Sequence, residues 1–294
     1  MPSIVNKCQC CYSSNLLSRQ SILSPFFSYK MFGYVPLKIK KKQFNDIKEG
    51  YSYYACKTLE CKKCGFLFLD QRFEKEEFKN YYFGYQNKNF FKQRVKFEKS
   101  FKNRIKNFKS SGIIAGKFNE INVVENFILK NIDKPNHILD FGAGDGKGTV
   151  FIGNKKIKKT LFDPFNYSRN NNTYSKLKFK NLNIDLITLR NVLEHVPYPI
   201  ELLKDIIKMS KKKTKFYIEV PKEKIIDKIS KKKRYIKKII WTEHINFFNF
   251  KALKMLLEIC DLKIIKKDVL VINKGNKGVT DNDREHYMLI AEKK

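Results

Sequence analysis

The spacing of apolar positions changes along the chain and separates a C-terminal part from an N-terminal part. From about residue 118 onward, short apolar runs alternate with stretches in which apolar residues recur every three or four positions. Short runs bounded by turn residues are typical of buried strands, and the longer spacing is typical of helices. The pattern predicts strands over 137–141, 159–163, 184–189 and 216–220. It predicts helices over 118–130, 198–209 and 250–259.

Regular alternation of strands and helices favours one sheet architecture. Strands joined through helices pair in parallel, with helices on both faces of the sheet. Two further apolar runs, 263–272 and 286–291, follow each other without a helix between them and predict a closing antiparallel strand pair. The expected fold class is therefore α/β, a doubly wound sheet with an antiparallel closing strand.

The N-terminal part has a different pattern. Short aromatic runs such as 51–54 and 66–69 predict hairpin strands within residues 1–70. Phe97, Phe101, Ile105 and Phe108 follow at spacings of four, four and three, as on one helix face. We interpret that face as packing between modules. The expected organisation is a small module over 1–70, a helical linker over 71–117 and the main domain over 118–294.

Net charge raises the question of a polyanionic partner. The formal charge is +32, but 53 of the 61 basic residues are Lys and only 8 are Arg. Lys, Asn and Ile share A/T-rich codons, and a phosphate-binding surface would be expected to use more Arg. Codon bias, a basic patch for an anionic small substrate, and RNA binding all stay open. A Lys-rich stretch at 231–238 could form a basic lid over a diphosphate, or only a solvated loop.

No stretch of the chain predicts a membrane span or a secretion signal. The sequence contains no apolar run of eighteen residues, and its first residues lack the apolar core of a signal peptide. We therefore expect a cytoplasmic protein, where clustered cysteines favour a metal site over disulfides.

Six of the seven cysteines fall within the first 64 residues. Two Cys-x-x-Cys pairs, Cys8 with Cys11 and Cys61 with Cys64, could each place two thiolates on one tetrahedral ion. Four thiolates leave no position for a substrate, so the expected site is structural zinc. The 49 residues between the pairs are more than in compact zinc motifs, and Cys10 and Cys56 are alternative members.

A glycine-rich turn follows the predicted strand at 137–141. Asp140, Gly142 and Gly144 lie in the segment Asp-Phe-Gly-Ala-Gly-Asp-Gly-Lys-Gly. Glycines allow a tight turn and a close approach of ligand to backbone. A dinucleotide fingerprint would need its third glycine at position 147, which is Lys. Asp140 instead suits a cationic group such as the ammonium of a methionine moiety.

Asp163 stands at the end of the next predicted strand, 21 residues after Gly142. A carboxylate at that place can accept both hydrogen bonds of a ribose diol.

Four segments together resemble one known family. Residues 138–146 resemble the first motif of class I S-adenosylmethionine-dependent methyltransferases, whose fold is Rossmann-like, and residues 185–199 resemble the fourth-strand motif of the branch that carries Val-Leu-Glu-His-Val. Residues 243–248 resemble the Glu-His-x-x-Phe-Phe segment of that branch. Residues 61–70, with Tyr81, Tyr82 and Tyr85, are similar to the zinc-binding domain often fused to it.

The resemblance implies S-adenosylmethionine as cofactor and assigns its contacts. It implies that Asp140, Gly142 and Gly144 hold the methionine end, that Asp163 holds the ribose, and that Asn191 and Leu193 line the floor near the sulfonium. Several members of the branch act on nucleotide-linked sugars or surface polysaccharides. The resemblance therefore implies methyl transfer to a hydroxyl or carbon of a small, anionic, carbohydrate-like acceptor or a glycan precursor.

Three residues are candidates for the acceptor chemistry. His244 is the leading general base, because histidine titrates near neutral pH, and Glu243 beside it could orient it. His195 is the second candidate. A structural role in a turn or at a helix start stays open for both histidines.

Two other functions stay open. An RNA methyltransferase could use the zinc module and the Lys-rich surface to bind phosphates. A non-catalytic binding protein could retain only the cofactor fold.

Overall fold

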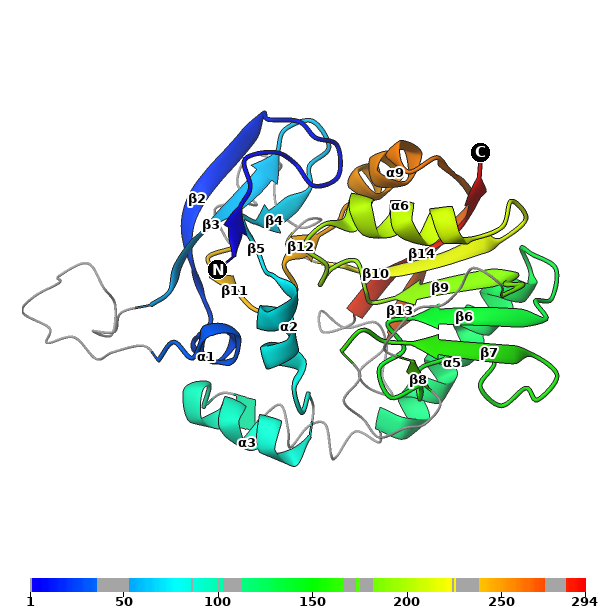
Figure 1. Ribbon diagram of the computed structural model, residues 1–294, viewed down its shortest axis with the longest axis horizontal. Helices are drawn as coiled ribbons and strands as arrows, with labels where there is room; N and C mark the ends of the chain where they lie inside the picture. Colours follow the sequence, from blue (N-terminus) through cyan, green and yellow to red (C-terminus); the bar gives the residue numbers. More distant parts are fainter. Residues whose placement is uncertain are drawn as a thin grey trace, which may run out of the picture.

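A computed structural model describes residues 2–35, 53–85, 87–99, 101–102, 113–165, 173–174, 182–223, 225, 238–272 and 284–294. Figure 1 shows two sheets, a smaller one formed mainly by the N-terminal part of the chain and a larger one formed by the C-terminal part.

The larger sheet has seven strands in the order β13-β14-β10-β9-β6-β7-β8. Its parallel strands are β6 (His137–Phe141), β7 (Lys158–Phe162), β8 (Thr173–Tyr174), β9 (Leu186–Arg190) and β10 (Lys215–Lys222). Strand β14 (Arg284–Lys293) lies antiparallel between β10 and β13 (Leu262–Ile272). The predicted doubly wound α/β sheet with an antiparallel closing strand is confirmed.

Helices cover both faces of this sheet. Helices α6 (Pro199–Met209) and α9 (Phe250–Ile259) lie together on one face, and α5 (Ile113–Leu129) lies on the other (Figure 1). Successive strand residues point to opposite faces. Leu139 of β6 accordingly packs in the core beneath α6 and α9, and its neighbour Ile138 packs with Val124 and Ile128 of α5.

The smaller sheet has five strands in the order β11-β2-β3-β4-β12. Three come from the N-terminal part: β2 (Leu16–Leu23), β3 (Ala55–Cys61) and β4 (Leu67–Leu69). The edge strands β11 (Ile240–Trp241) and β12 (Asn246–Phe247) come from the chain after β10. A separate two-stranded ribbon pairs β1 (Ser3–Ile4) with β5 (Gln71–Arg72).

An aromatic core joins this sheet to helices α1 (Pro25–Phe32), α2 (Lys75–Tyr82) and α3 (Lys88–Phe97). Phe26 and Tyr81 each meet the ring of Phe90 edge to face, at centroid distances of 5.0 and 5.8 Å. The stripe predicted over 97–108 is described only at its beginning. Phe97 stacks on Tyr29 there, whereas Ile105 and Phe108 lie outside the described residues.

The segment after β10 connects the two sheets through buried hydrogen bonds. Trp241 donates from Nε1 to Thr58 Oγ1 of β3 at 2.8 Å. The amide of Asn246, 1% exposed, donates to the carbonyls of Leu193 (2.8 Å) and Val196 (2.6 Å) and accepts from Arg72. Strands β11 and β12 thus belong to the smaller sheet, although they lie within the main domain predicted over 118–294. The three domain boundaries stay predictions.

Substitution Asn246→Ala should lower the free energy of unfolding by about 2–4 kcal/mol, because it leaves two buried carbonyls and Arg72 without a partner. Urea denaturation followed by circular dichroism measures the change. Asn15→Ala, at an exposed position, is the matched control and should change stability by less than about 0.5 kcal/mol. Equal stability of the two variants would show that the Asn246 bonds do not hold the sheets together.

Candidate functional site

The glycine-rich loop after β6 takes a backbone that needs its glycines. Gly142, Gly144 and Gly146 have φ values of 79°, 55° and 78°. A Cβ at Gly142 would lie 2.5 Å from Cγ2 of Val192, so a side chain there would collide. The amides of Gly142 and Ala143 both donate to the carbonyl of Phe162, which holds the loop against the end of β7.

Asp140 lies beneath this loop and is 4% exposed. Its two carboxylate oxygens accept from the hydroxyls of Thr149 and Thr188, each at 2.6 Å. Burial raises the pKa of Asp140, and the two hydroxyl donors oppose that rise. The carboxylate is therefore held in one orientation with its charge only partly compensated.

A pocket of about 170 Å³ opens at the loop. It is lined by Glu120, Ile121, Asp140, Gly142, Ala143, Gly148, Arg190 and Asn191. A buried carboxylate and a guanidinium in one small pocket, under a backbone without side chains, suit the ammonium and carboxylate of an amino acid. The methionine end of S-adenosylmethionine fits this set of groups.

Asp163 follows β7 and supports the same loop. Its Oδ2 accepts from the amide of Gly144 at 2.9 Å, and its Oδ1 accepts from the amide of Phe165 at 2.8 Å. Burial raises the pKa of Asp163 against these two bonds. Each oxygen has a second lone pair, so the carboxylate can still accept from a ribose.

Arg190 and Glu219 were not singled out from the sequence. Arg190 Nε donates to Glu219 Oε2 at 2.9 Å, and its Nη1 donates to the carbonyl of Gly148 in the loop. Glu219 also accepts from Tyr217 Oη and His286 Nδ1. Burial would raise the pKa of Glu219, but Arg190 and His286 together lower it to about 2. In the sequence, the opposite charges of Arg190 and Glu219 near the ends of two apolar runs could have indicated this ion pair.

Asn191 and Leu193, both assigned to the cofactor floor, lie in different environments. Asn191 lines the pocket. Its φ of 54° is a left-handed value that Asn adopts more readily than most residues, and its backbone N–H donates to the Glu219 carbonyl. The side chain of Leu193 is fully buried in the core beneath α6 and α9, and it does not line the pocket.

The two predicted catalytic histidines lie together. Their rings meet edge to face with centroids 4.7 Å apart. His195 Nδ1 donates to the carbonyl of Glu243 at 2.9 Å, and His244 Nδ1 donates to the carboxylate of Glu223 at 3.1 Å. The carboxylate of Glu243 pairs instead with Arg94 at 3.5 Å. Glu223, not Glu243, is therefore the carboxylate that orients His244.

Glu194 completes this group and was also missed. It is 1% exposed, and neither carboxylate oxygen has a hydrogen-bond partner. Burial raises the pKa of Glu194 to about 8, against the attraction of His244. One ligand atom from each of Glu194, His195 and His244 lies within 4.8 Å of the others. Its position between apolar residues, within 192–196, was the sequence feature that could have indicated a buried carboxyl group.

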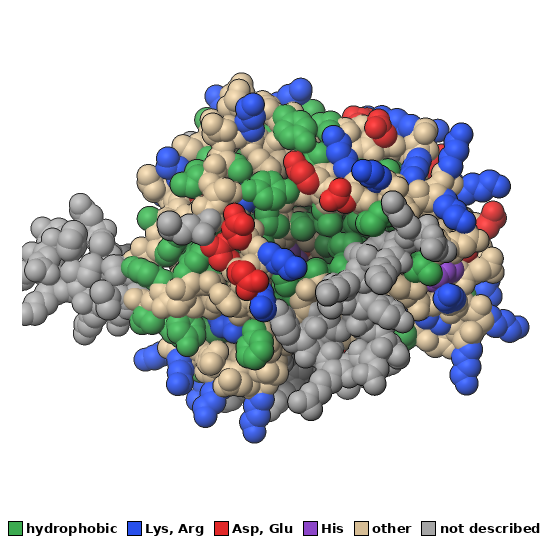
Figure 2. Space-filling model, in the orientation of Figure 1, with side chains coloured by type: hydrophobic (Ala, Val, Ile, Leu, Met, Phe, Trp, Pro, Cys, Tyr) green, Lys and Arg blue, Asp and Glu red, His purple; other side chains and the backbone are tan. Residues whose placement is uncertain are grey.

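Aromatic rings connect the histidines to the cofactor loop. Tyr82 of α2 stacks on Phe165, with centroids 5.5 Å apart, and meets the His195 ring at 6.3 Å. Phe165 follows Asp163 by two residues. Figure 2 shows a hollow with an apolar floor between the two parts of the molecule, with acidic side chains near it and Lys and Arg along the outline.

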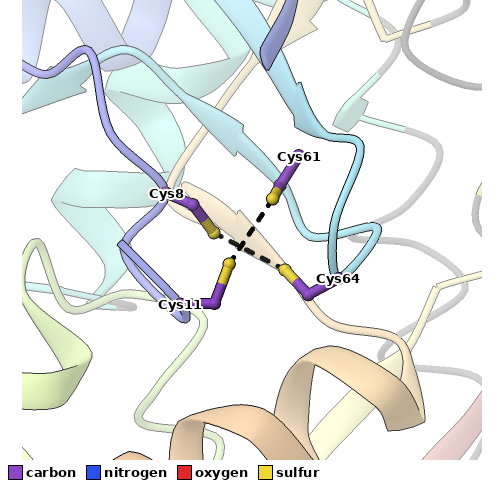
Figure 3. A group of neighbouring side chains, drawn as sticks. All are labelled: Cys8, Cys11, Cys61 and Cys64. Atoms are coloured by element: carbon purple, nitrogen blue, oxygen red, sulfur yellow. Dashed lines mark hydrogen bonds between the residues drawn. The ribbon is translucent and has the colours of Figure 1, made fainter. Parts of the chain in front are cut away.

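The sulfurs of Cys8, Cys11, Cys61 and Cys64 point to one centre (Figure 3). The Sγ atoms of Cys8 and Cys64, and those of Cys11 and Cys61, are 3.5 Å apart, and all four residues are buried. Thiolates about 2.3 Å from a tetrahedral ion would be separated by about 3.8 Å. The group fits a zinc ion. Cys10 and Cys56 do not belong to it.

Local turns and strand pairing build this group. In each Cys-x-x-Cys pair the amide after the second cysteine, Tyr12 or Gly65, donates to the carbonyl of the first, and both residues have positive φ. Leu16 of β2 pairs with Cys61 of β3, so the antiparallel hairpin returns the second pair to the first. The long separation in sequence is thereby bridged.

The Lys-rich stretch at 231–238 lies outside the described residues except for Lys238. Lys238 Nζ lies 4.9 Å from the Trp241 ring centroid, and burial lowers the pKa of Lys238 to about 8.

Among the described helices, none is both long and apolar enough to cross a membrane.

Comparison with known families agrees with this geometry. Residues 120–267, half of the chain, match the model of a methyltransferase domain family. The chain therefore belongs to this family. The protein is an S-adenosylmethionine-dependent methyltransferase, and the third alternative, a binding protein without catalysis, is set aside.

Three solved structures illustrate the range of similar proteins. A SAM-dependent methyltransferase from Methanosarcina mazei is 18% identical (57% of this chain, 96% of that chain, TM-score 0.41). The Burkholderia thailandensis 1,6-didemethyltoxoflavin-N1-methyltransferase is 15% identical (68% and 86%, TM-score 0.43). A SAM-dependent methyltransferase from Archaeoglobus fulgidus is 16% identical (59% and 94%, TM-score 0.39). A search of curated proteins gave no match.

Substitution Glu219→Gln should cost about 3–5 kcal/mol of stability at neutral pH, because it leaves the buried Arg190 charge unpaired. The pKa of Glu219 is lowered to about 2, below its value of about 4.5 in the unfolded chain. The stabilisation is therefore present above about pH 4.5 and lost as the pH falls toward 2.

Urea unfolding of wild type and variant between pH 7 and pH 2 measures this difference, which should narrow on acidification. Glu258→Gln, an exposed carboxylate on α9, is the control and should show almost no difference at any pH. A difference in the free energy of unfolding that stays constant from pH 7 to pH 2 would contradict the assigned ionisation of Glu219.

Proposed function

We propose that this methyltransferase transfers a methyl group to a hydroxyl or carbon of a small anionic carbohydrate acceptor, such as a nucleotide-linked sugar or a glycan precursor. One observation carries the proposal. The pocket of Asp140 and Arg190 and the pair His195 and His244 lie at the same edge of the sheet, joined by the rings of Tyr82 and Phe165.

The cofactor would occupy the glycine-rich loop. Asp140 would bind its ammonium group, Arg190 its carboxylate and Asp163 its ribose hydroxyls. S-adenosylmethionine supplies an electrophilic methyl group on a sulfonium. Methyl transfer from a sulfonium requires in-line positioning of the acceptor more than covalent help from the protein.

The acceptor would lie between the cofactor loop and the two histidines. Tyr82 and Phe165 offer aromatic surface for a ring, and His195, His244 and Glu194 offer polar groups for a hydroxyl. A pocket with apolar walls and a few oriented polar groups is typical of small-molecule sites. The proposed role of the two histidines is therefore to contact the acceptor.

RNA is the second candidate acceptor, and the net charge of +32 favours it. On the face drawn in Figure 2, many of the Lys and Arg side chains of the described residues lie near the outline.

Substitution Asp140→Asn should weaken S-adenosylhomocysteine binding roughly 10- to 150-fold, as expected for loss of a charge-assisted hydrogen bond worth about 1.5–3 kcal/mol. Calorimetric titration of the full chain measures the affinity. The control is Asp205→Asn, an exposed carboxylate on α6, which should bind like wild type. Unchanged affinity in Asp140→Asn would remove Asp140 from the cofactor site.

The same titration repeated with a panel of nucleotide sugars tests the acceptor class. Tightening of S-adenosylhomocysteine binding by one nucleotide sugar would support the proposal. No effect of any sugar, together with RNA binding that weakens steeply with salt, would favour the RNA candidate instead.

We also propose that Cys8, Cys11, Cys61 and Cys64 hold one structural zinc ion. All four sulfurs are engaged at one centre, so no position is left for a substrate. Thiolates persist in a reducing compartment, which supports a cytoplasmic location. A small module with such a site gains folding free energy from the metal.

Elemental analysis of the purified chain should find about one zinc ion per chain, and Cys61→Ser should lose it because three thiolates cannot close the site. Cys260→Ser is the control, since Cys260 is buried in the core beneath α6 and α9, away from the cluster. Zinc retained by Cys61→Ser at wild-type stoichiometry would exclude this ligand set.

A further inference from the structure

The carboxyl group of Glu194 is buried and has no hydrogen-bond partner among the described residues. It is 1% exposed, and both oxygens lack hydrogen bonds within the described structure. Its own backbone carbonyl is fixed, because it accepts from the amides of Ile245 and Asn246 at 2.9 and 3.1 Å. Burying a carboxylate without compensation is strongly unfavourable. A group from outside the chain would supply that compensation.

Two imidazoles present lone pairs beside this carboxylate. His195 and His244 both use Nδ1 to donate, to Glu243 O and Glu223 Oε1. A neutral imidazole that donates through Nδ1 carries its lone pair on Nε2. Nε2 of His195 lies 3.9 Å from Oε1 of Glu194. When both imidazoles are neutral, each offers a nitrogen lone pair beside this carboxylate, and one ligand atom of each of the three residues lies within 4.8 Å of the others.

The partners of the two histidines match a known feature of metal sites. A histidine that ligates a metal almost always donates its other ring N–H to a carboxylate or a backbone carbonyl, which fixes the tautomer. His244 donates to the carboxylate of Glu223, and His195 donates to the carbonyl of Glu243. Both rings are thus held with Nε2 available for an ion.

The surrounding charge favours a cation. The carboxylates of Glu194, Glu223 and Glu243 all act on His244, and they are opposed by Arg94, which pairs with Glu243, and by Lys238. In the metal-bound state, in which both imidazoles are neutral and the carboxylates are ionised, three negative charges stand against two positive charges. One negative charge is left over.

We propose that Glu194, His195 and His244 bind a divalent transition-metal ion, as a second metal site besides the four cysteines. Two imidazole nitrogens and one carboxylate oxygen suit ions such as Mn²⁺, Fe²⁺ or Co²⁺. Ligands about 2.1 Å from a tetrahedral ion are about 3.4 Å apart. His195 Nε2 and Glu194 Oε1 are 3.9 Å apart and the three ligand atoms lie within 4.8 Å of one another, so each pair of side chains would close by at most about 1.4 Å to hold an ion.

Three protein ligands leave coordination positions open, unlike the four-thiolate site. An acceptor hydroxyl between the cofactor loop and the histidines would complete the coordination. This consequence rests on the proposed function, whereas the binding of the ion itself does not.

The test is a calorimetric titration of the full chain, carrying one zinc ion in its cysteine site, with Mn²⁺ and separately with Co²⁺. We expect one further ion per chain from at least one of the two metals. Glu194→Gln should weaken that binding at least 10-fold, and Glu223→Gln, which removes the partner of His244, should weaken it 10- to 100-fold. Glu258→Gln is the control and should bind like wild type.

A second measurement separates loss of a ligand from loss of the fold. In metal-free buffer Glu194→Gln should melt close to the wild-type Tm, because it replaces a buried carboxyl group that makes no hydrogen bond with an amide of similar size. Added ion should raise only the wild-type Tm. Failure of both ions to bind, or equal binding by Glu194→Gln, would overturn the proposal. S-adenosylhomocysteine binding, measured in parallel, would then show whether the methyltransferase function stands without it.

Discussion

The hydrogen-bonded contact between residues 243–248 and residues 192–196 is the constraint on which the rest of the structure depends. The carbonyl of Glu194 accepts from two successive amides, and the Asn246 amide donates to two carbonyls of the same turn. These groups are buried, and an unpaired buried peptide group costs free energy comparable to a lost hydrogen bond. The turn after β9 therefore cannot shift without the segment that forms β11 and β12. Because those strands are edges of the smaller sheet, the cysteine module, the two histidines and the cofactor sheet are held as one arrangement.

Three buried carboxyl groups differ in how their charge is compensated. The difference distinguishes a residue that positions another side chain from residues available to bind a ligand. Glu219 accepts from a guanidinium, a phenol and an imidazole, and it holds Arg190 against the glycine-rich loop. Asp140 accepts from two hydroxyls and faces the pocket. Glu194 has no hydrogen-bond partner among the described residues. Burying this carboxyl group lowers the stability of the fold. Proteins tolerate such a cost mainly at functional sites, where a ligand is bound.

Charge placement was only partly predictable from the chain order. Glu243 precedes His244 in sequence and was expected to orient it, but Glu243 lies in a bend between β11 and β12 and its carboxylate meets Arg94 of α3. The carboxylate that orients His244 lies 21 residues earlier, at the end of β10. Leu193 was expected at the cofactor and lies in the core beneath α6 and α9 for a similar reason: only one side of a short turn faces the pocket.

Local patterns determined what the sequence by itself could predict. The apolar periods, the glycine-rich turn and the two Cys-x-x-Cys turns depend on residues a few positions apart, so the α/β class, the cofactor loop and the candidate cysteine ligands were all available from it. The tertiary structure decided which distant segments meet: the β2–β3 pairing that bridges 49 residues between the cysteine pairs, and the addition of β11 and β12 to the N-terminal sheet. It also decided the meeting of Glu194 with His244. Such contacts depend on the balance of burial and hydrogen bonding over the whole chain, which no local spacing encodes.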